Sequence, residues 1–94
     1  MNITIKEHCG SFAENKDVAK KLRETLILPS FKSKEKTITI DFSDIDSSTQ
    51  SFIHALLSDV FRKHGETALK RMQFKGCNKP IKSLVGTVIN YSLE

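Results

Sequence analysis

The chain has 94 residues, of which 38% are hydrophobic and 28% charged, and its formal net charge is +4 at pH 7. This length and composition are typical of one small globular domain, and we expect a single domain over residues 1–94. The sequence has no apolar run of about 20 residues, which excludes a transmembrane helix, and its start lacks the basic-then-apolar order of a signal peptide. We therefore expect a cytoplasmic protein whose two distant cysteines, Cys9 and Cys77, are reduced thiols.

The positive charge leaves three interpretations open: a solvated surface, an acidic protein partner, or nucleic acid. The basic residues are scattered, without the interleaved aromatic residues that single-strand binders use. This pattern favours a solvated surface first and nucleic acid last. Examples of this scatter on a predicted helix, a loop and a predicted strand are, in that order, Lys20, Lys21 and Arg23; Lys32, Lys34 and Lys36; and Lys70, Arg71 and Lys75.

The chain begins with a pattern typical of a strand. Residues 2–6 alternate between polar and apolar side chains, and Ile3 and Ile5 share one face. The alternation then breaks, and Gly10 and Ser11 indicate a turn that we expect Phe12 to anchor.

A helix is predicted next, because Asn15 or Asp17 can accept the unpaired amides of a first turn. Apolar residues recur at four-residue spacing behind this cap and form one stripe. We expect the helix to end at Pro29, since the residue before a proline avoids helical geometry. The residues of the stripe are Val18, Leu22 and Leu26, with Ala19 beside them.

The middle of the chain predicts a strand and then the most apolar helix. After a basic loop over residues 31–36, residues 37–42 alternate with Ile38, Ile40 and Phe42 on one face. Residues 51–64 carry a wide apolar stripe, and Gly65 is a good helix stop. The stripe consists of Phe52, Ile53, Leu56, Leu57, Val60 and Phe61.

The last part of the chain predicts a third strand and a third helix. Met72 and Phe74 indicate a strand over residues 70–75, and Pro80 suits the first position of a helix over residues 80–91. Gly86 lies inside this helix, where we expect it to mark close packing.

The resulting element order, β-α-β-α-β-α, predicts parallel strands joined by helical crossovers. The fold class is α/β, a small sandwich with a three- or four-stranded, mostly parallel sheet. One sheet face is apolar, so we expect the helices mainly on that face.

The segment 41–51, DFSDIDSSTQS, is the best candidate for a functional site. It lies where a parallel strand ends, which is where ligands and partners gather on such sheets. Its carboxylates and hydroxyls are also ordinary turn and cap chemistry, so that interpretation stays open. Hydroxyls at a helix N-terminus are nevertheless well placed for phosphorylation.

The chain resembles the STAS domain (sulfate transporter and anti-sigma-factor antagonist). The resemblance rests on D-F-S-D-I at 41–45 and on the polar turn that ends in T-Q-S-F at 49–52. It is closest to the small bacterial STAS-like proteins, through FAENKDVAKKLRE at 12–24 and RMQFKGCN at 71–78.

The resemblance implies a non-catalytic regulatory module that docks on a kinase-like ATPase or another signalling protein. Anti-sigma-factor antagonists are switched by phosphorylation of a serine in this turn. An ungapped match puts Gln50 at that serine's position, Thr49 at the preceding Asp, Ser51 at the second hydroxyl and Phe52 at a usual Gly. Ser51 is therefore our first phosphorylation candidate and Thr49 our second. The partner-binding residues we expect, in the turn and on the helix after it, are Asp44, Asp46, Ser47, Ser48, Gln50, His54, Ser58 and Arg62.

Other functions have weaker support in the sequence. The cysteines and histidines lack the close pairs of a zinc site, so we expect no metal, and we expect no cofactor. Neither a G-x-S-x-G nucleophile motif nor a phosphate-binding loop is present, so we do not expect an enzyme. A basic accessory protein that binds nucleic acid is the alternative function, and a homodimer is compatible with the fold.

Overall fold

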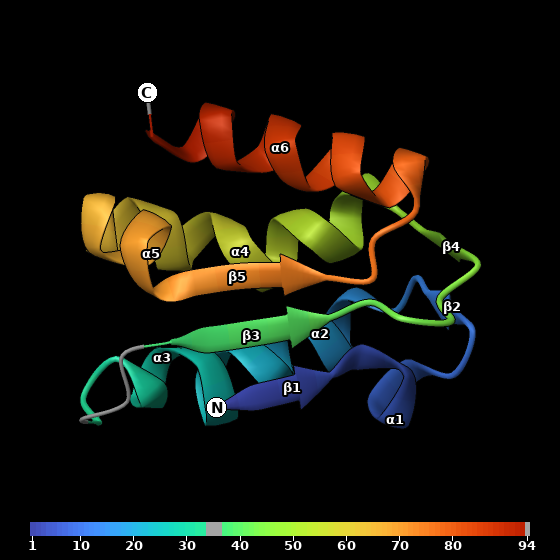
Figure 1. Cartoon of the computed structure of the whole chain (residues 1–94), viewed down its shortest axis with the longest axis horizontal. Coiled ribbons are helices and arrows are strands. Elements are labelled where there is room, and N and C mark those ends of the chain that lie inside the picture. The colour runs from blue at the N-terminus through green and yellow to red at the C-terminus, as the bar shows by residue number, and fades with distance from the viewer. Residues whose placement is uncertain (34–36, 94) are drawn as a thin grey trace.

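The computed structural model describes residues 1–33 and 37–93 and shows an α/β arrangement (Figure 1). Residues 34–36 of the predicted basic loop lie outside the described residues. The strands are β1 (Asn2–Thr4), β2 (Phe12–Ala13), β3 (Ile38–Asp41), β4 (Ser47–Ser48) and β5 (Met72–Lys75). The helices are α1 (Ile5–Cys9), α2 (Lys16–Leu22), the π-helical turn η1 (Arg23–Ile27), α3 (Leu28–Ser30), α4 (Gln50–His64), α5 (Glu66–Arg71) and α6 (Lys79–Leu93).

Three strands form the main sheet in the order β1-β3-β5, and all are parallel. The register places Ile3 beside Ile40 and Ile40 beside Phe74, so one apolar row crosses the sheet. The polar residues of the alternation point to the other face. The predicted α/β fold class is therefore confirmed, and β2 and β4 add a separate two-stranded parallel sheet.

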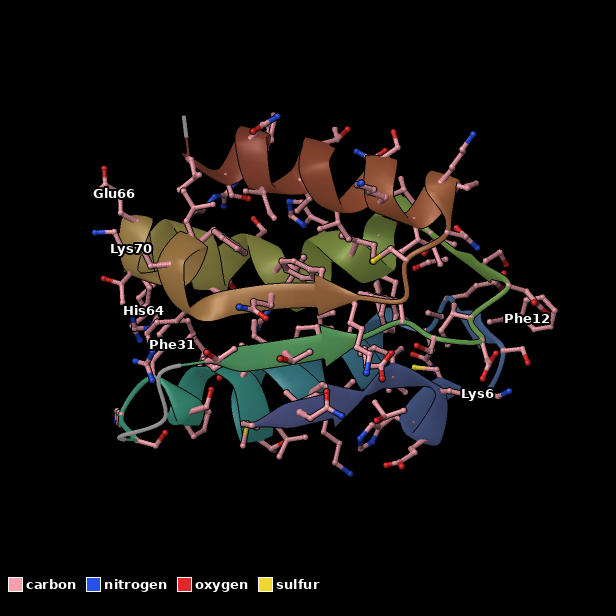
Figure 2. All side chains as sticks on the ribbon, in the orientation of Figure 1. Lys6, Phe12, Phe31, His64, Glu66 and Lys70 are labelled. Carbon is pink, nitrogen blue, oxygen red and sulfur yellow. The ribbon has the colours of Figure 1, made fainter. Side chains whose placement is uncertain are left out.

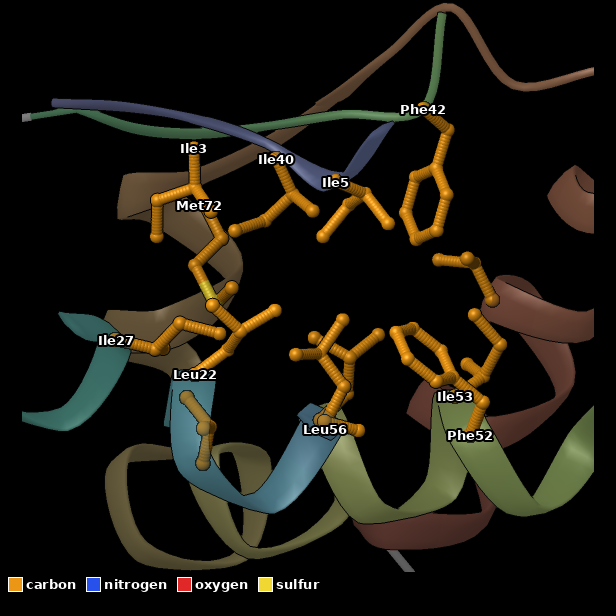
Figure 3. Packing of buried hydrophobic residues seen from close by; sticks show 14 of the residues in the cluster. Ile3, Ile5, Leu22, Ile27, Ile40, Phe42, Phe52, Ile53, Leu56 and Met72 are labelled. Atoms are coloured by element: carbon orange, nitrogen blue, oxygen red, sulfur yellow. The ribbon is translucent and has the colours of Figure 1, made fainter. Parts of the chain in front are cut away.

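The core lies between the apolar sheet face and the helices (Figure 3). Ile3 and Ile40 of the strands, and Phe42 directly after β3, point toward helix residues such as Leu22 and Leu56. Helix α4 packs against both α2 and α6, and its predicted apolar stripe is buried along its whole length. Helix α4 is thus the central helix, and its first turn is fixed in position against the rest of the molecule.

The helix that begins after Asn15 passes through Pro29, so the predicted end at this proline is wrong. Asn15 caps the helix, since its side chain accepts the N–H of Asp17 (2.9 Å). A π-helical turn then widens the helix, and the N–H of Leu28 reaches the carbonyl of Arg23. Pro29 falls in the first turn of α3, where its missing N–H is not needed.

Several predicted strand boundaries are also corrected. The first strand stops at Thr4, because Ile5 already begins α1 while its side chain stays in the core. Lys70 and Arg71 belong to α5, so the third strand begins at Met72. Phe12 does not anchor its turn, since its side chain is 57% exposed.

Two glycines behave differently from each other in the last third of the chain. Gly65 ends α4 with a φ of 51°, as predicted for a helix stop. Gly86 is exposed within α6, and a Cβ added there would meet nothing within 4 Å. The expected close packing at Gly86 is therefore wrong.

Candidate partner-binding surface

The turn after β3 has a firmly held backbone. Asp41 accepts a hydrogen bond from the N–H of Ser43 (2.8 Å), and the N–H of Phe42 donates to the carbonyl of Lys75 (2.7 Å). Hydrogen bonds from the Ser43 side chain and backbone hold the pKa of Asp41 below its ordinary value of 3.8, and Lys75 adds to this effect. Asp44 then takes a φ of 62°, a left-handed conformation that Asp tolerates better than most residues.

Asn78 joins this turn to the start of α6. Its amide nitrogen donates to the carbonyls of Ile45 and Asp46, both at 3.2 Å. Its side-chain oxygen accepts the N–H of Ile81 at 3.0 Å and so caps α6. One side chain therefore ties the loop before α4 to the loop before α6.

The short β2–β4 pair partly covers the serines of the turn. Ser47 lies beside Phe12, and Ser48 lies beside Ala13. The Ser48 hydroxyl donates to the carbonyl of Ala13 at 2.7 Å. Both serines are half-buried. They therefore help to hold the β2–β4 pair together, and they also lie in the turn where we expected them.

Helix α4 begins beside this pair. The Thr49 hydroxyl accepts the N–H of Phe52 at 3.1 Å, which is N-cap geometry. Gln50 and Ser51 follow in the first turn with exposed side chains, whereas Phe52 is buried. The helix thus presents Gln50 and Ser51 outward where its free amides and dipole favour negative charge.

Two shallow hollows adjoin the exposed first turns of α4. One, of about 420 Å³, is lined by Lys16, Gln50, Ser51, His54 and Ala55. The other, of about 340 Å³, is lined by Gln50, His54, Thr87, Val88 and Tyr91. Because both hollows include Gln50 and His54, they form one continuous surface from α2 across α4 to α6.

Two of the expected site residues lie elsewhere. The Ser58 side chain was predicted on the exposed side of the helix, but it is only 2% exposed, and that placement is wrong. Its hydroxyl is buried without a hydrogen-bond partner. Arg62 is exposed but follows Gln50 by about 18 Å along the helix axis. The structure therefore brings together Gln50, Ser51 and His54 and leaves Arg62 at the far end of α4.

Sequence reasoning missed three exposed residues that adjoin the turn or the hollows beside α4, namely Phe12, Tyr91 and Lys16. Phe12 projects outward from this end (Figure 2), beside Ser47 and close to Asp46, whose N–H donates to Ser11. Tyr91 is 62% exposed on the far side of the second hollow. One feature of the sequence could have indicated that Phe12 is exposed: it lies among polar residues, after the alternating pattern of the first strand has ended. Nothing in the sequence linked Tyr91 or Lys16 to α4.

The polar groups that this surface exposes include carboxylates, amides, hydroxyls and an imidazole. Within residues 1–33 and 37–93, no group of three or more His, Cys, Asp or Glu could hold a metal ion. Burial raises the pKa of both the Cys9 and the Cys77 thiol, so neither is an activated nucleophile at neutral pH. Exposed carboxylate, amide, hydroxyl and imidazole groups remain, and they can form hydrogen bonds and ion pairs with another macromolecule.

Comparisons with known proteins agree with the fold. A model of a protein family described as a STAS-like domain of unknown function matches residues 18–82. No curated protein and no solved structure matches the chain. None of the helices in the described part of the chain has the length and apolar character needed to cross a membrane.

Proposed function

Because the chain belongs to the family of STAS-like domains of unknown function, we propose that it is a non-catalytic regulatory module that binds another protein. The partner is a kinase-like ATPase or another signalling protein. Asp44, Asp46 and the exposed first turns of α4 make the contact, and Phe12 and Tyr91 flank it.

The observation that supports this proposal is the contrast between fixed backbone and exposed side chains at one end of the molecule. Hydrogen bonds that Asn78 donates and Thr49 accepts hold the turn, while Gln50, Ser51 and His54 point to solvent. A surface that is ordered before binding loses little conformational entropy on binding. Exposed aromatic residues such as Phe12 and Tyr91 are typical anchors of protein interfaces.

Phosphorylation of Ser51 is the regulatory step we propose for this surface. Ser51 is exposed in the first turn of α4, where a phosphate is favoured by the helix dipole. Thr49 is the second candidate, because its hydroxyl already serves as the N-cap. Phosphopeptide mapping of the protein from its native host identifies the modified residue. If neither Ser51 nor Thr49 is phosphorylated, the proposed phosphorylation step is contradicted, but the docking proposal is not affected.

Recovery of partners from the native host by tagged variants tests the docking proposal. We expect His54→Glu and Ser51→Asp to reduce recovery of the wild-type partner by at least about 10-fold, as for interface anchors. Arg62→Glu is expected to have less effect, because Arg62 lies at the far end of α4. Thr67→Glu, an equal change of charge on exposed α5, is the matched control and should keep full recovery.

Equal recovery of the partner by wild type, His54→Glu and Thr67→Glu would contradict the proposed surface.

Nucleic acid is the alternative partner, and fluorescence anisotropy with random DNA and RNA distinguishes it. Binding at about 50 mM salt that falls steeply at higher salt would support nucleic acid. The described basic residues of the three groups lie on different elements, namely α2, η1, the segment after α3, α5 and β5. A second copy of the chain as partner is identified by co-purification of two differently tagged copies.

A further inference from the structure

A separate cavity lies at the opposite end of the molecule from the turn. It has a volume of about 330 Å³, and the residues that line it include Leu28, Phe31, Lys32, Lys63 and His64. The end of α4 and the segment after α3 bring these residues together, and Figure 2 shows Phe31 and His64 close to each other there. This volume is at the lower end of the range for small-molecule pockets. The cavity therefore suits a compact ligand with one or two rings.

Stacked planar groups form one wall of the cavity. The rings of Phe31 and His64 are parallel within 4°, with centroids 4.1 Å apart. The guanidinium of Arg71 lies over the Phe31 ring at 5.1 Å from its centroid. Arg71 also donates to the carbonyls of Phe31 (3.0 Å) and Ser30 (3.1 Å), so the stack is held to the backbone. Because His64 and Arg71 both lie against the Phe31 ring, a further planar group would extend the stack on the His64 side.

Among the residues that the structure describes, most charges around the stack are positive. Lys32 and Lys63 line the cavity, and Arg71 lies against Phe31. Burial, and then the charges of Lys63 and Arg71, lower the pKa of His64. Among the described residues of the lining, Glu24 is the acidic one, and its carboxylate is engaged by Arg23 at 2.9 Å. The cavity therefore favours a ligand that carries negative charge.

We propose that this cavity binds a small planar aromatic anion, whose ring extends the Phe31–His64 stack and whose negative group faces Lys32 and Lys63. The size of the cavity limits the ligand to a compact ring system. The parallel rings select a planar ligand, and the lysines select an anion. This site does not involve the surface of the proposed docking function, so either proposal can fail without the other.

Titration of the full chain with 2-naphthoate, followed by two-dimensional NMR, tests this site. We expect saturable shifts confined to residues around Phe31 and His64, with a dissociation constant on the order of 1 mM, as for a ligand of this size. Decahydro-2-naphthoate keeps the charge but is not aromatic, and 2-naphthamide is aromatic but neutral. Both should bind at least about 5-fold more weakly, since each lacks one of the two interactions. Equal binding of the saturated acid would show simple attraction of charge and overturn the proposal.

Variants of the lining separate the two interactions. Lys63→Gln should weaken 2-naphthoate binding several-fold, and His64→Phe should retain more binding than His64→Ala because it keeps a planar ring. His8→Ala, at an exposed position of α1, is the matched control and should bind like wild type. Unchanged affinity in both Lys63→Gln and His64→Ala would place the ligand elsewhere and contradict the proposal.

Proton linkage gives a readout that a purely structural role of His64 would not produce. A bound anion stabilises the imidazolium, so saturation with 2-naphthoate should raise the pKa of His64 toward its ordinary value. The groups that act on His64 from the neighbouring elements are Lys63, Arg71 and the Phe31 ring, with Glu24 and Lys32 in the same cavity. A His64 titration that is identical with and without 2-naphthoate would contradict the proposal.

Discussion

At the scale of single residues, the turn depends on a close contact between Ser43 and Gly76. Gly76 has a φ of 71°, which L side chains rarely adopt. A Cβ there would lie 2.6 Å from the Ser43 nitrogen and 2.8 Å from its Cα, and it would also collide with the Ser43 hydroxyl. The residue after β5 is thus restricted to glycine by both conformation and space.

Gly76→Ala is therefore expected to destabilise the protein by about 2–4 kcal/mol, from left-handed strain and backbone displacement. Gly86→Ala is the matched control, because Gly86 lies in a helix with open space around it. It should stabilise the protein by about 0.5–1 kcal/mol through helix propensity. Urea denaturation measures both changes, and a loss of stability in Gly86→Ala comparable to that in Gly76→Ala would contradict this account.

At the scale of elements, Asn78 connects the turn before α4 with the first turn of α6. Asn78→Ala removes the cap and both bonds to the turn, and should cost about 1–2 kcal/mol. Asn78→Asp keeps an acceptor for the Ile81 N–H but loses the donor to Ile45 and Asp46. Hydrogen exchange distinguishes the two variants. Exchange at Asp46 should speed up in both, and exchange at Ile81 only in Asn78→Ala. Unchanged exchange at Ile81 in Asn78→Ala would show that the side chain has no capping role.

The elements that sequence alone predicted are those with long, regular apolar patterns. The strand that contains Ile38 and Ile40, and the helices that became α4 and α6, needed only periodicity and caps. Short elements such as β2, β4 and α5 escaped prediction, because tertiary pairing decides segments of two to six residues. The helix through Pro29 escaped because a π-helical turn places the proline where its missing N–H does no harm.

The candidate site was predictable only in part for a related reason. Periodicity identifies the buried stripe of α4, but it assigns all the remaining positions of the helix to solvent. Ser58 contradicts that assignment, since α4 is enclosed by two neighbouring helices and this serine is buried. Tyr91 and Lys16 reach the surface of α4 through packing of distant segments, which one sequence does not reveal.

At the scale of the whole molecule, the aromatic residues fall into a core set and a surface set. Phe42 is fully buried between the sheet and the helices, and Phe12 is 57% exposed (Figures 2 and 3). A chain of this length has a free energy of unfolding of about 5–14 kcal/mol, so one large cavity removes much of it. Substitution of Phe42 therefore tests the stability of the fold, and substitution of Phe12 tests the binding of a partner.

Phe42→Ala should lower the free energy of unfolding by about 3–5 kcal/mol, because it leaves a cavity in the core. Phe12→Ala should change it by less than about 0.5 kcal/mol, as for an exposed side chain, and should instead weaken partner recovery. Thermal and urea denaturation measure the first effect, and the tagged recovery experiment measures the second. A large loss of stability in Phe12→Ala would assign this residue to the fold instead of the surface.

Each of the helices α2, α4 and α6 begins at the end of the molecule where the strands finish (Figure 1), because each follows a parallel strand. Their backbone dipoles therefore add, and the positive pole lies beneath the turn. Asp17, Asp44 and Asp46 lie at this pole and partly neutralise it. The protein is thus electrically asymmetric along its strands, independently of its net charge. Replacing these aspartates with asparagine would make this one pole more attractive to anions.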